Sequence, residues 1–273
     1  MSVINTNVSA TLTSNALAKN DRAMSQSMER LSTGQRINSA SDDAAGLAIA
    51  SKMTSQIRGL DQAVRNGNDA ISMVQTADGA LIEVSNMLQR MRELAVQSSS
   101  DTNTSTDRTA LNTEFTALTA QIEATMDNTQ WNGQDLLDGD SASLSFQVGA
   151  NASQTITVTT LADMQTAGDA FKDLAGTATE TTLATLVITD GTKAANSIKG
   201  IDSALAVVNT KRAELGSTVN RLEYAVDNLA NVSQNASASR SRVQDANYAT
   251  ESTELARTQI IQQAGTAMLA QAN

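Results

Sequence analysis

Residues 193–233 read KAANSIKGIDSALAVVNTKRAELGSTVNRLEYAVDNLANVS, and this stretch decides the predicted fold. Apolar residues recur along it in alternating steps of three and four, at nine of the ten positions in that series. They are Ile198, Ile201, Leu205, Val208, Leu215, Val219, Leu222, Val226 and Leu229, and Arg212 is the interruption. A 3.5-residue period sustained this long indicates a coiled-coil seam, which requires another long helix to cover it.

A second seam of the same period supplies the expected partner. Residues 43–99 predict a long helix whose apolar series is interrupted by Gly67, Asp78 and Ser85. The series is Ile57, Leu60, Val64, Ile71, Val74, Leu81 and Leu88. A polar turn at 98–106 then leads to a third helix, with Leu111, Phe115, Leu118, Ile122 and Met126 in one stripe. Both helices are expected to pack against residues 193–233.

Between the long helices the period of the apolar residues changes to two. Leu144, Phe146 and Val148 alternate with polar residues, as do Ile156 and Val158 after a turn at 149–151. This pattern predicts a β-hairpin. Residues 161–191 are rich in Thr, Ala and Gly, and we predict a short helix at 170–174 and a strand at 186–189. The fold class is therefore mainly α, an elongated antiparallel helical bundle or coiled coil with a small β-hairpin region.

The two ends of the chain, 2–33 and 245–273, carry sparser apolar residues than the helices between them. Their stripes are Leu12, Leu17, Met28 and Leu31 at one end, and Leu255, Ile260, Ile261 and Leu269 at the other. Segments this polar cannot offset the entropy cost of ordering by themselves. We expect them to be disordered alone and helical when packed against copies of the chain. The alternative is that these residues belong to an ordinary core.

Composition restricts the function classes. The chain has 273 residues, no His, Cys or Pro, and a net charge of −10. Without His or Cys the usual general bases, thiol nucleophiles and zinc ligands are missing, so we expect no enzyme, metal or cofactor. The acid pairs Asp42–Asp43 and Glu123–Asp127 are read as solvated charges. The acidity argues against nucleic-acid binding, no apolar run is long enough for membrane insertion, and the N-terminus does not resemble a cleaved signal peptide.

Four stretches, taken in order, resemble bacterial flagellin. They are LSTGQRINSASDDAAGLAIASKM (31–53), QRMRELAVQS (89–98), NTQWNGQDLL (128–137) and SRVQDANYATESTELARTQIIQQAGTAMLAQAN (241–273). Trp131 stands where Phe is usual in the family. The resemblance covers roughly residues 1–158 and 193–273. It implies a secreted subunit that leaves by the flagellar type III export system and polymerises into the extracellular filament used for motility.

The resemblance also implies a division of the chain into layers called D0, the inner tube, and D1, which surrounds it. Residues 1–40 would form the N-terminal D0 helix and a connecting spoke, and 41–160 the N-terminal part of D1. Residues 161–192 would be a short variable segment, 193–235 the C-terminal D1 helix, and 236–273 the C-terminal D0 helix. The family usually continues about ten residues beyond Asn273, so we expect this chain's last helix to be shortened.

Three sets of residues carry functions that the resemblance implies. The two apolar stripes of the chain ends would build the inner tube, and Asn38, Ser39, Asp42 and Asp43 would form the spoke, although 39–46 also fits a plain helix cap and turn. A third set would face the vertebrate flagellin-sensing Toll-like receptor: Gln89, Arg90, Glu93, Leu94, Gln97 and Glu114. The alternative for this third set is a solvated helix face that contacts the next subunit.

The expected partners are other copies of the chain, a flagellar export chaperone, the filament cap, hook–filament junction proteins and the receptor. A hook–filament junction protein, which shares the terminal signatures more loosely, is the alternative function.

Overall fold

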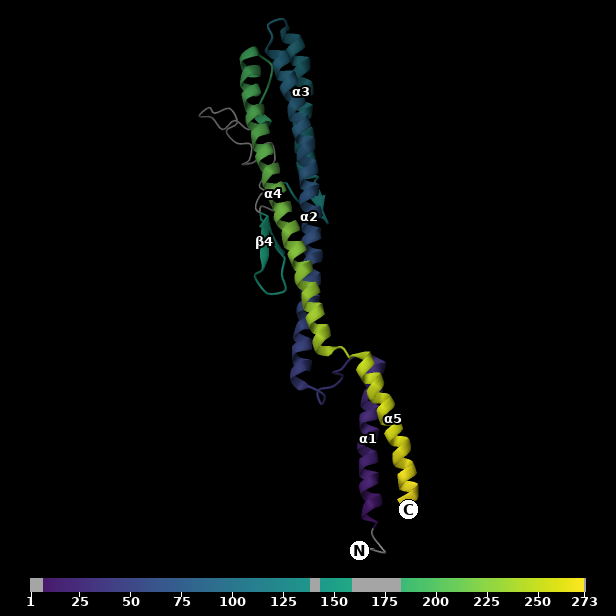
Figure 1. The fold of residues 1–273 in the computed structure, drawn as a ribbon. Helices are drawn as coiled ribbons and strands as arrows, with labels where there is room; N and C mark the ends of the chain where they lie inside the picture. The colour runs from purple at the N-terminus through teal and green to yellow at the C-terminus, as the bar shows by residue number, and fades with distance from the viewer. Residues whose placement is uncertain (1–6, 138–142, 159–182, 273) are drawn as a thin grey trace. The chain divides into compact units, whose positions relative to one another are not determined.

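The structure is a computed structural model that describes residues 7–137, 143–158 and 183–272. Its helices are α1 (Val8–Thr33), α2 (Ala44–Ser99), α3 (Ser105–Asp127), α4 (Gly191–Gln244), α5 (Tyr248–Ala272) and the 3-10 turn η2 (Leu183–Thr185) (Figure 1). The strands are β1 (Gln130–Trp131), β2 (Gln134–Asp135), β3 (Leu144–Gln147) and β4 (Thr155–Val158). The predicted mainly α fold is confirmed.

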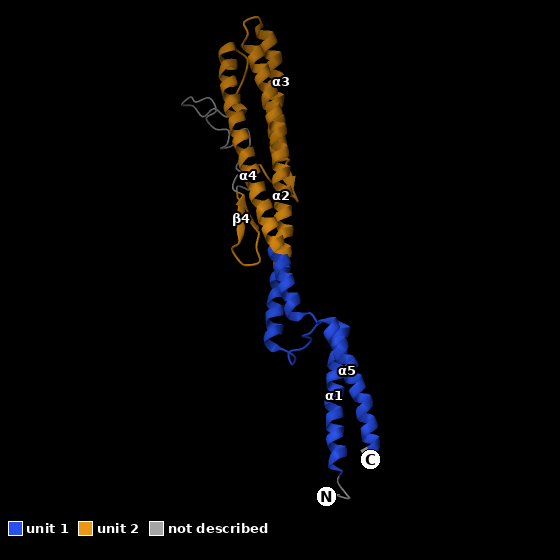
Figure 2. Ribbon diagram, in the orientation of Figure 1, with its two compact units in different colours: residues 1–58, 232–273 blue, residues 59–231 orange. Residues whose placement is uncertain are grey.

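The chain separates into two compact units (Figure 2). The first, which we call the terminal unit, contains residues 1–58 and 232–273; the second, the central unit, contains residues 59–231. Helices α2 and α4 contribute residues to both units, whereas α1 and α5 lie only in the terminal unit. The five-segment division expected from the sequence remains a prediction.

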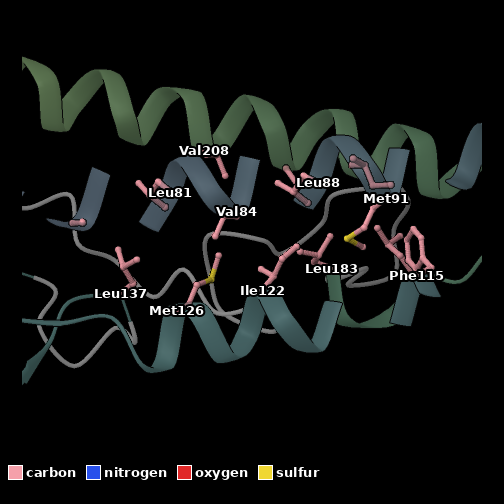
Figure 3. Packing of buried hydrophobic residues seen from close by; sticks show 14 of the residues in the cluster. Leu81, Val84, Leu88, Met91, Phe115, Ile122, Met126, Leu137, Leu183 and Val208 are labelled. Atoms are coloured by element: carbon pink, nitrogen blue, oxygen red, sulfur yellow. The ribbon is translucent and has the colours of Figure 1, made fainter. Parts of the chain in front are cut away.

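The central unit has an apolar core in which the two predicted seams meet. Leu81 and Leu88 of α2 are buried in one cluster with Val208 of α4, and α3 adds Phe115 and Ile122 from the other side (Figure 3). Burial of side chains of this size contributes about 1.5–3 kcal/mol each. The predicted partnership of the three helices is therefore confirmed.

The polar interruptions of the two seams are matched to each other in space. Arg212 Nε donates to Asp78 Oδ1 at 2.8 Å, so the interruption of one seam neutralises that of the other. At Gly67, an added Cβ would lie 2.5 Å from Cγ2 of Val226, so the missing side chain makes room for an apolar residue of α4. These breaks in the apolar pattern therefore belong to the packing of α2 against α4.

The predicted hairpin is formed by β3 and β4, which pair antiparallel with Phe146 opposite Ile156. Asn66 Nδ2 of α2 donates to the carbonyl oxygen of Gln147 at 3.2 Å and so ties the hairpin to the bundle. A second, smaller hairpin of β1 and β2 was not predicted. Its turn is Asn132-Gly133, and both residues have positive φ, 52° and 76°. Asn-Gly is the dipeptide that favours such a turn, so the sequence did contain the signal.

The predicted strand at 186–189 is wrong. This segment is irregular and lies between helices, where side chains satisfy its main-chain polar groups. Asn112 Oδ1 accepts from the N–H of Ile188 at 2.9 Å, while Ser98 Oγ donates to the Ile188 carbonyl at 2.5 Å. Ser197 Oγ donates to the Val187 carbonyl at 2.9 Å. Since no neighbouring strand is needed, apolar alternation here marks burial rather than a sheet. The helix predicted at 170–174 lies outside the described residues.

The expected end of the 193–235 helix is also wrong, because α4 continues to Gln244. The polar run after Ser233 contains no Gly or Pro, so nothing in it breaks a helix. Within the terminal unit, Arg240 Nη1 of this extension donates to Thr54 Oγ1 of α2 at 3.4 Å. The polarity of the run reflects exposure, and not a turn.

Candidate functional site

Helices α1 and α5 lie side by side in the terminal unit and run antiparallel (Figure 1). The residues buried between them are polar: Asn20 and Ser27 on α1, Glu251 and Thr258 on α5. Each pair of residues is seven apart, which places both members on one face of their helix. That spacing was a usable signal for this interface, but the sequence analysis followed only the apolar residues.

Polar side chains make the contacts across this interface. Asn20 Nδ2 donates to the carbonyl oxygen of Thr258 at 2.7 Å, and Arg30 Nη1 donates to Glu251 Oε1 at 3.1 Å. Gln262 Nε2 donates to Asp21 Oδ1 at 3.0 Å, and Tyr248 Oη donates to the carbonyl oxygen of Leu31 at 3.1 Å. The two helices are thus joined mainly through hydrogen bonds and one ion pair.

The large apolar side chains of α1 and α5 lie mostly on the outside of the pair. Leu12 is 71% exposed, Met28 54%, Ile260 67% and Ile261 42%. The other four predicted inner-tube residues, which are Leu17, Leu31, Leu255 and Leu269, are half-buried. None of the eight is buried, so they do not form an ordinary core within this chain.

The predicted spoke residues lie in the segment between α1 and α2, which pairs with the segment between α4 and α5. Gln35 and Asp245 form an antiparallel β-bridge, and the Arg36 N–H donates to the Gln244 carbonyl at 2.7 Å. Gly34 ends α1 with φ of 70°, a left-handed conformation suited to glycine. The two connections between helices are therefore joined through their main chains.

Asp42 and Asp43 organise the turn before α2. The N–H groups of Asn38 and Ser39 donate to Asp42 Oδ2 at 3.2 and 3.0 Å, and Gln26 Nε2 donates to its Oδ1 at 2.9 Å. Donation by the Ser39 N–H, followed by the Gln26 amide, lowers the pKa of the Asp42 carboxyl below its ordinary value. Asp43 Oδ1 accepts from the Gly46 N–H at 2.8 Å, which is an N-cap contact.

The exposed face around Arg90 lies in the central unit. Arg90 Nη1 donates to Glu93 at 2.9 Å, and its Nη2 donates to Glu114 of α3 at 2.9 Å. Hydrogen bonding to Glu93, and next to Glu114, raises the pKa of the Arg90 guanidinium. Gln89 and Gln97 are exposed on the same helix. The structure therefore brings together five of the six residues that the sequence assigned to this surface.

Leu94, the sixth, is a correction. Its side chain is 1% exposed and belongs to the apolar core of the central unit. It follows Met91 by three residues and continues the seam of α2. Its neighbours Glu93 and Gln97 point outward, so proximity in sequence did not mean proximity on the surface. Leu94 supports the Arg90 face from beneath.

Comparison with known proteins shows the family. A profile of the bacterial flagellin N-terminal helical region matches residues 4–142, and one of the C-terminal helical region matches 198–273. The chain belongs to the bacterial flagellin family. It is 48% identical to a flagellin of Halalkalibacterium halodurans over 272 residues, which cover 99% of this chain and 96% of that protein. It is 41% identical to a flagellin of Bacillus subtilis, which it matches over 99% of this chain and 96% of that protein.

Among solved structures, the chain resembles Bacillus cereus flagellin, with 31% identity and a TM-score of 0.50 over 60% of this chain and 88% of that one. As a flagellin, it is a structural subunit that polymerises into the extracellular flagellar filament and serves motility. No helix within the described residues is long and apolar enough to cross a membrane. The described residues also hold no cluster of three or more acidic, His or Cys side chains suited to a metal ion.

Proposed function

We propose that this flagellin polymerises through the outward apolar residues of α1 and α5. The observation that carries the proposal is that these helices place polar residues between them and large apolar residues outside. Leu12 and Ile260 are 71% and 67% exposed, and apolar area of that size favours burial at about 25 cal/mol per Å². A neighbouring copy of the chain provides the surface that covers them.

The experiment is filament growth from short filament seeds, with replacement of both residues by serine in the full chain. We expect L12S/I260S to raise the monomer concentration needed for growth at least about tenfold, since two exposed apolar side chains are lost from the contact. The matched control L12M/I260L keeps the apolar area and should grow like the parent. Normal growth of the serine variant, with its helix content unchanged, would contradict the proposal.

The same assay separates a filament subunit from a hook–filament junction protein, the alternative function. A filament subunit adds to its own growing end many times, whereas a junction protein stops after a short layer. We expect long filaments. Growth that ends after a few subunits would favour the junction protein.

A second candidate function is recognition of the Arg90 face by the flagellin-sensing Toll-like receptor. In its favour, Arg90 is exposed and held between Glu93 and Glu114, so its guanidinium is presented in a defined position. We expect R90A to weaken activation of receptor-bearing cells by tenfold or more. R92A is the matched control, because Arg92 lies two residues away, is also exposed and pairs with Asp202 instead. Equal activation by R90A and the parent would exclude this role.

The remaining parts of the proposal follow from family membership. The chain acts without catalysis, and its other partners are an export chaperone, the filament cap and the hook–filament junction. The segment containing Asn38, Ser39, Asp42 and Asp43 acts as the spoke between the D0 and D1 layers. Replacing both acids, as D42A/D43A, is expected to impair filament growth, and normal filaments would count against the spoke.

A further inference from the structure

The α1/α5 pair has few apolar contacts that could fix how its helices align along each other. The face that α1 presents to α5 contains Asn20 and Ser27, and α5 answers with Glu251 and Thr258. The closest glycine contact is also small: a Cβ added to Gly265 would lie 3.2 Å from Cδ1 of Leu17. Faces built from small and polar residues can slide by one heptad at little cost in packing, so register is weakly specified by shape.

The polar contacts, by contrast, differ between registers. Arg30 lies opposite Glu251, and its ion pair is shielded, since the two side chains are only 24% and 12% exposed. Arg30 Nε is itself buried and has no hydrogen-bond partner within the described residues. A guanidinium that has lost this much water depends on its one carboxylate.

A slip of seven residues separates these charges. In one direction it places Thr258 opposite Arg30, and in the other it places Ala23 opposite Glu251. Neither residue carries an opposite charge, so a buried charge would be left uncompensated in both cases. Asn20 would likewise lose the Thr258 carbonyl to which it donates at 2.7 Å. A single polar residue inside a helix pair is known to specify register in this way.

We propose that Arg30, Glu251 and Asn20 are the residues that determine the register between α1 and α5. Their contacts decide which residues of the two helices face each other, and hence which apolar residues face outward. The inference is independent of the proposed polymerisation, because α1 and α5 belong to the same chain. It can therefore be tested without filament growth.

Disulfide trapping in the full chain tests the register directly, since the protein has no cysteine of its own. Two reporter pairs are made. L17C/G265C joins residues that are in contact in the structure, and M24C/G265C reports the register shifted by seven residues. Each is oxidised at low protein concentration, and the intramolecular disulfide is measured by mass spectrometry. In the parent we expect the native reporter to exceed the shifted one by at least about tenfold.

Each reporter is then combined with R30E, with E251R, with N20A and with the charge swap R30E/E251R. We expect the ratio of native to shifted disulfide to fall about tenfold in R30E and E251R, and less in N20A. The charge swap should restore the ratio to within about twofold of the parent. R257E is the matched control, because Arg257 is exposed and pairs with Glu254 on its own helix.

Two outcomes would overturn the proposal. One is an unchanged ratio in R30E and E251R. The other is a parallel loss of both disulfides with the ratio kept, because the contacts would then stabilise the pair without selecting its register. Failure of L12S/I260S to affect filament growth would leave this result untouched.

Discussion

The α2/α3/α4 core and the α1/α5 pair use similar helices in opposite ways. In the core, Leu81, Leu88 and Phe115 are fully buried within the chain. In the α1/α5 pair, Asn20 and Thr258 are buried, while the large apolar residues lie outside. The first arrangement gains its burial from folding, and the second leaves most of its burial for contact with other copies. The comparison teaches that helical structure alone does not indicate where the stabilising contacts will be.

The largest contrast is expected in amide hydrogen exchange of the free chain. Exchange in the core requires near-global unfolding, whereas a polar helix pair opens locally. Amides around Leu88 and Val208 should therefore exchange on the order of a thousandfold more slowly than those of 8–33 and 248–272, a difference of about 4 kcal/mol. Mass spectrometry of exchanged peptides measures both regions in one sample. Equal protection of the two regions would break the comparison.

Next comes the same substitution made in both regions. L88A removes a side chain that is 0% exposed and should lower the free energy of unfolding by about 2–5 kcal/mol. L12A removes one that is 71% exposed and should change it by less than about 0.5 kcal/mol. Denaturant unfolding followed by circular dichroism measures both variants. A cost for L12A close to that for L88A would mean that α1 is part of the core.

A smaller effect is expected from the matched interruptions of the two seams. The Asp78 and Arg212 side chains are 36% and 35% exposed, so solvent weakens their ion pair. A double-mutant cycle with D78A and R212A should give a coupling of about 0.5–1 kcal/mol. The pair Arg92–Asp202, which is 46% and 49% exposed, should couple less. A larger coupling for the more exposed pair would argue against shielding as the cause.

The smallest expected effect concerns pH. Because hydrogen bonds lower the pKa of folded Asp42, its contribution to stability is complete above the unfolded pKa, about 4, and is lost as the pH falls through the folded pKa. D42N lacks this titration. Between pH 5 and about pH 3, the parent should therefore lose more stability in the terminal unit than D42N does. Parallel pH profiles of the two proteins would show that Asp42 does not contribute.

The sequence predicted the core better than the terminal unit for a physical reason. Apolar periodicity reports where a helix buries area within its chain, and Leu81 and Val208 follow it closely. It fails where burial is polar, as at Asn20, and where a residue such as Leu94 lies beneath an exposed face. It also fails at 186–189, where apolar alternation marks an irregular buried segment. The Asn132-Gly133 turn was readable but was absorbed into a family motif.

The segment around Ile188 has a consequence for how this protein can change by mutation. Its main chain is held by Ser98, Asn112 and Ser197, which come from three different helices. Every amino acid except proline offers the same N–H and C=O groups, so the held segment can exchange its exposed side chains without disturbing its anchors. The three anchoring residues have no such freedom. Inheritance should therefore preserve three small polar residues scattered over the chain, although none of them touches another copy or a ligand here.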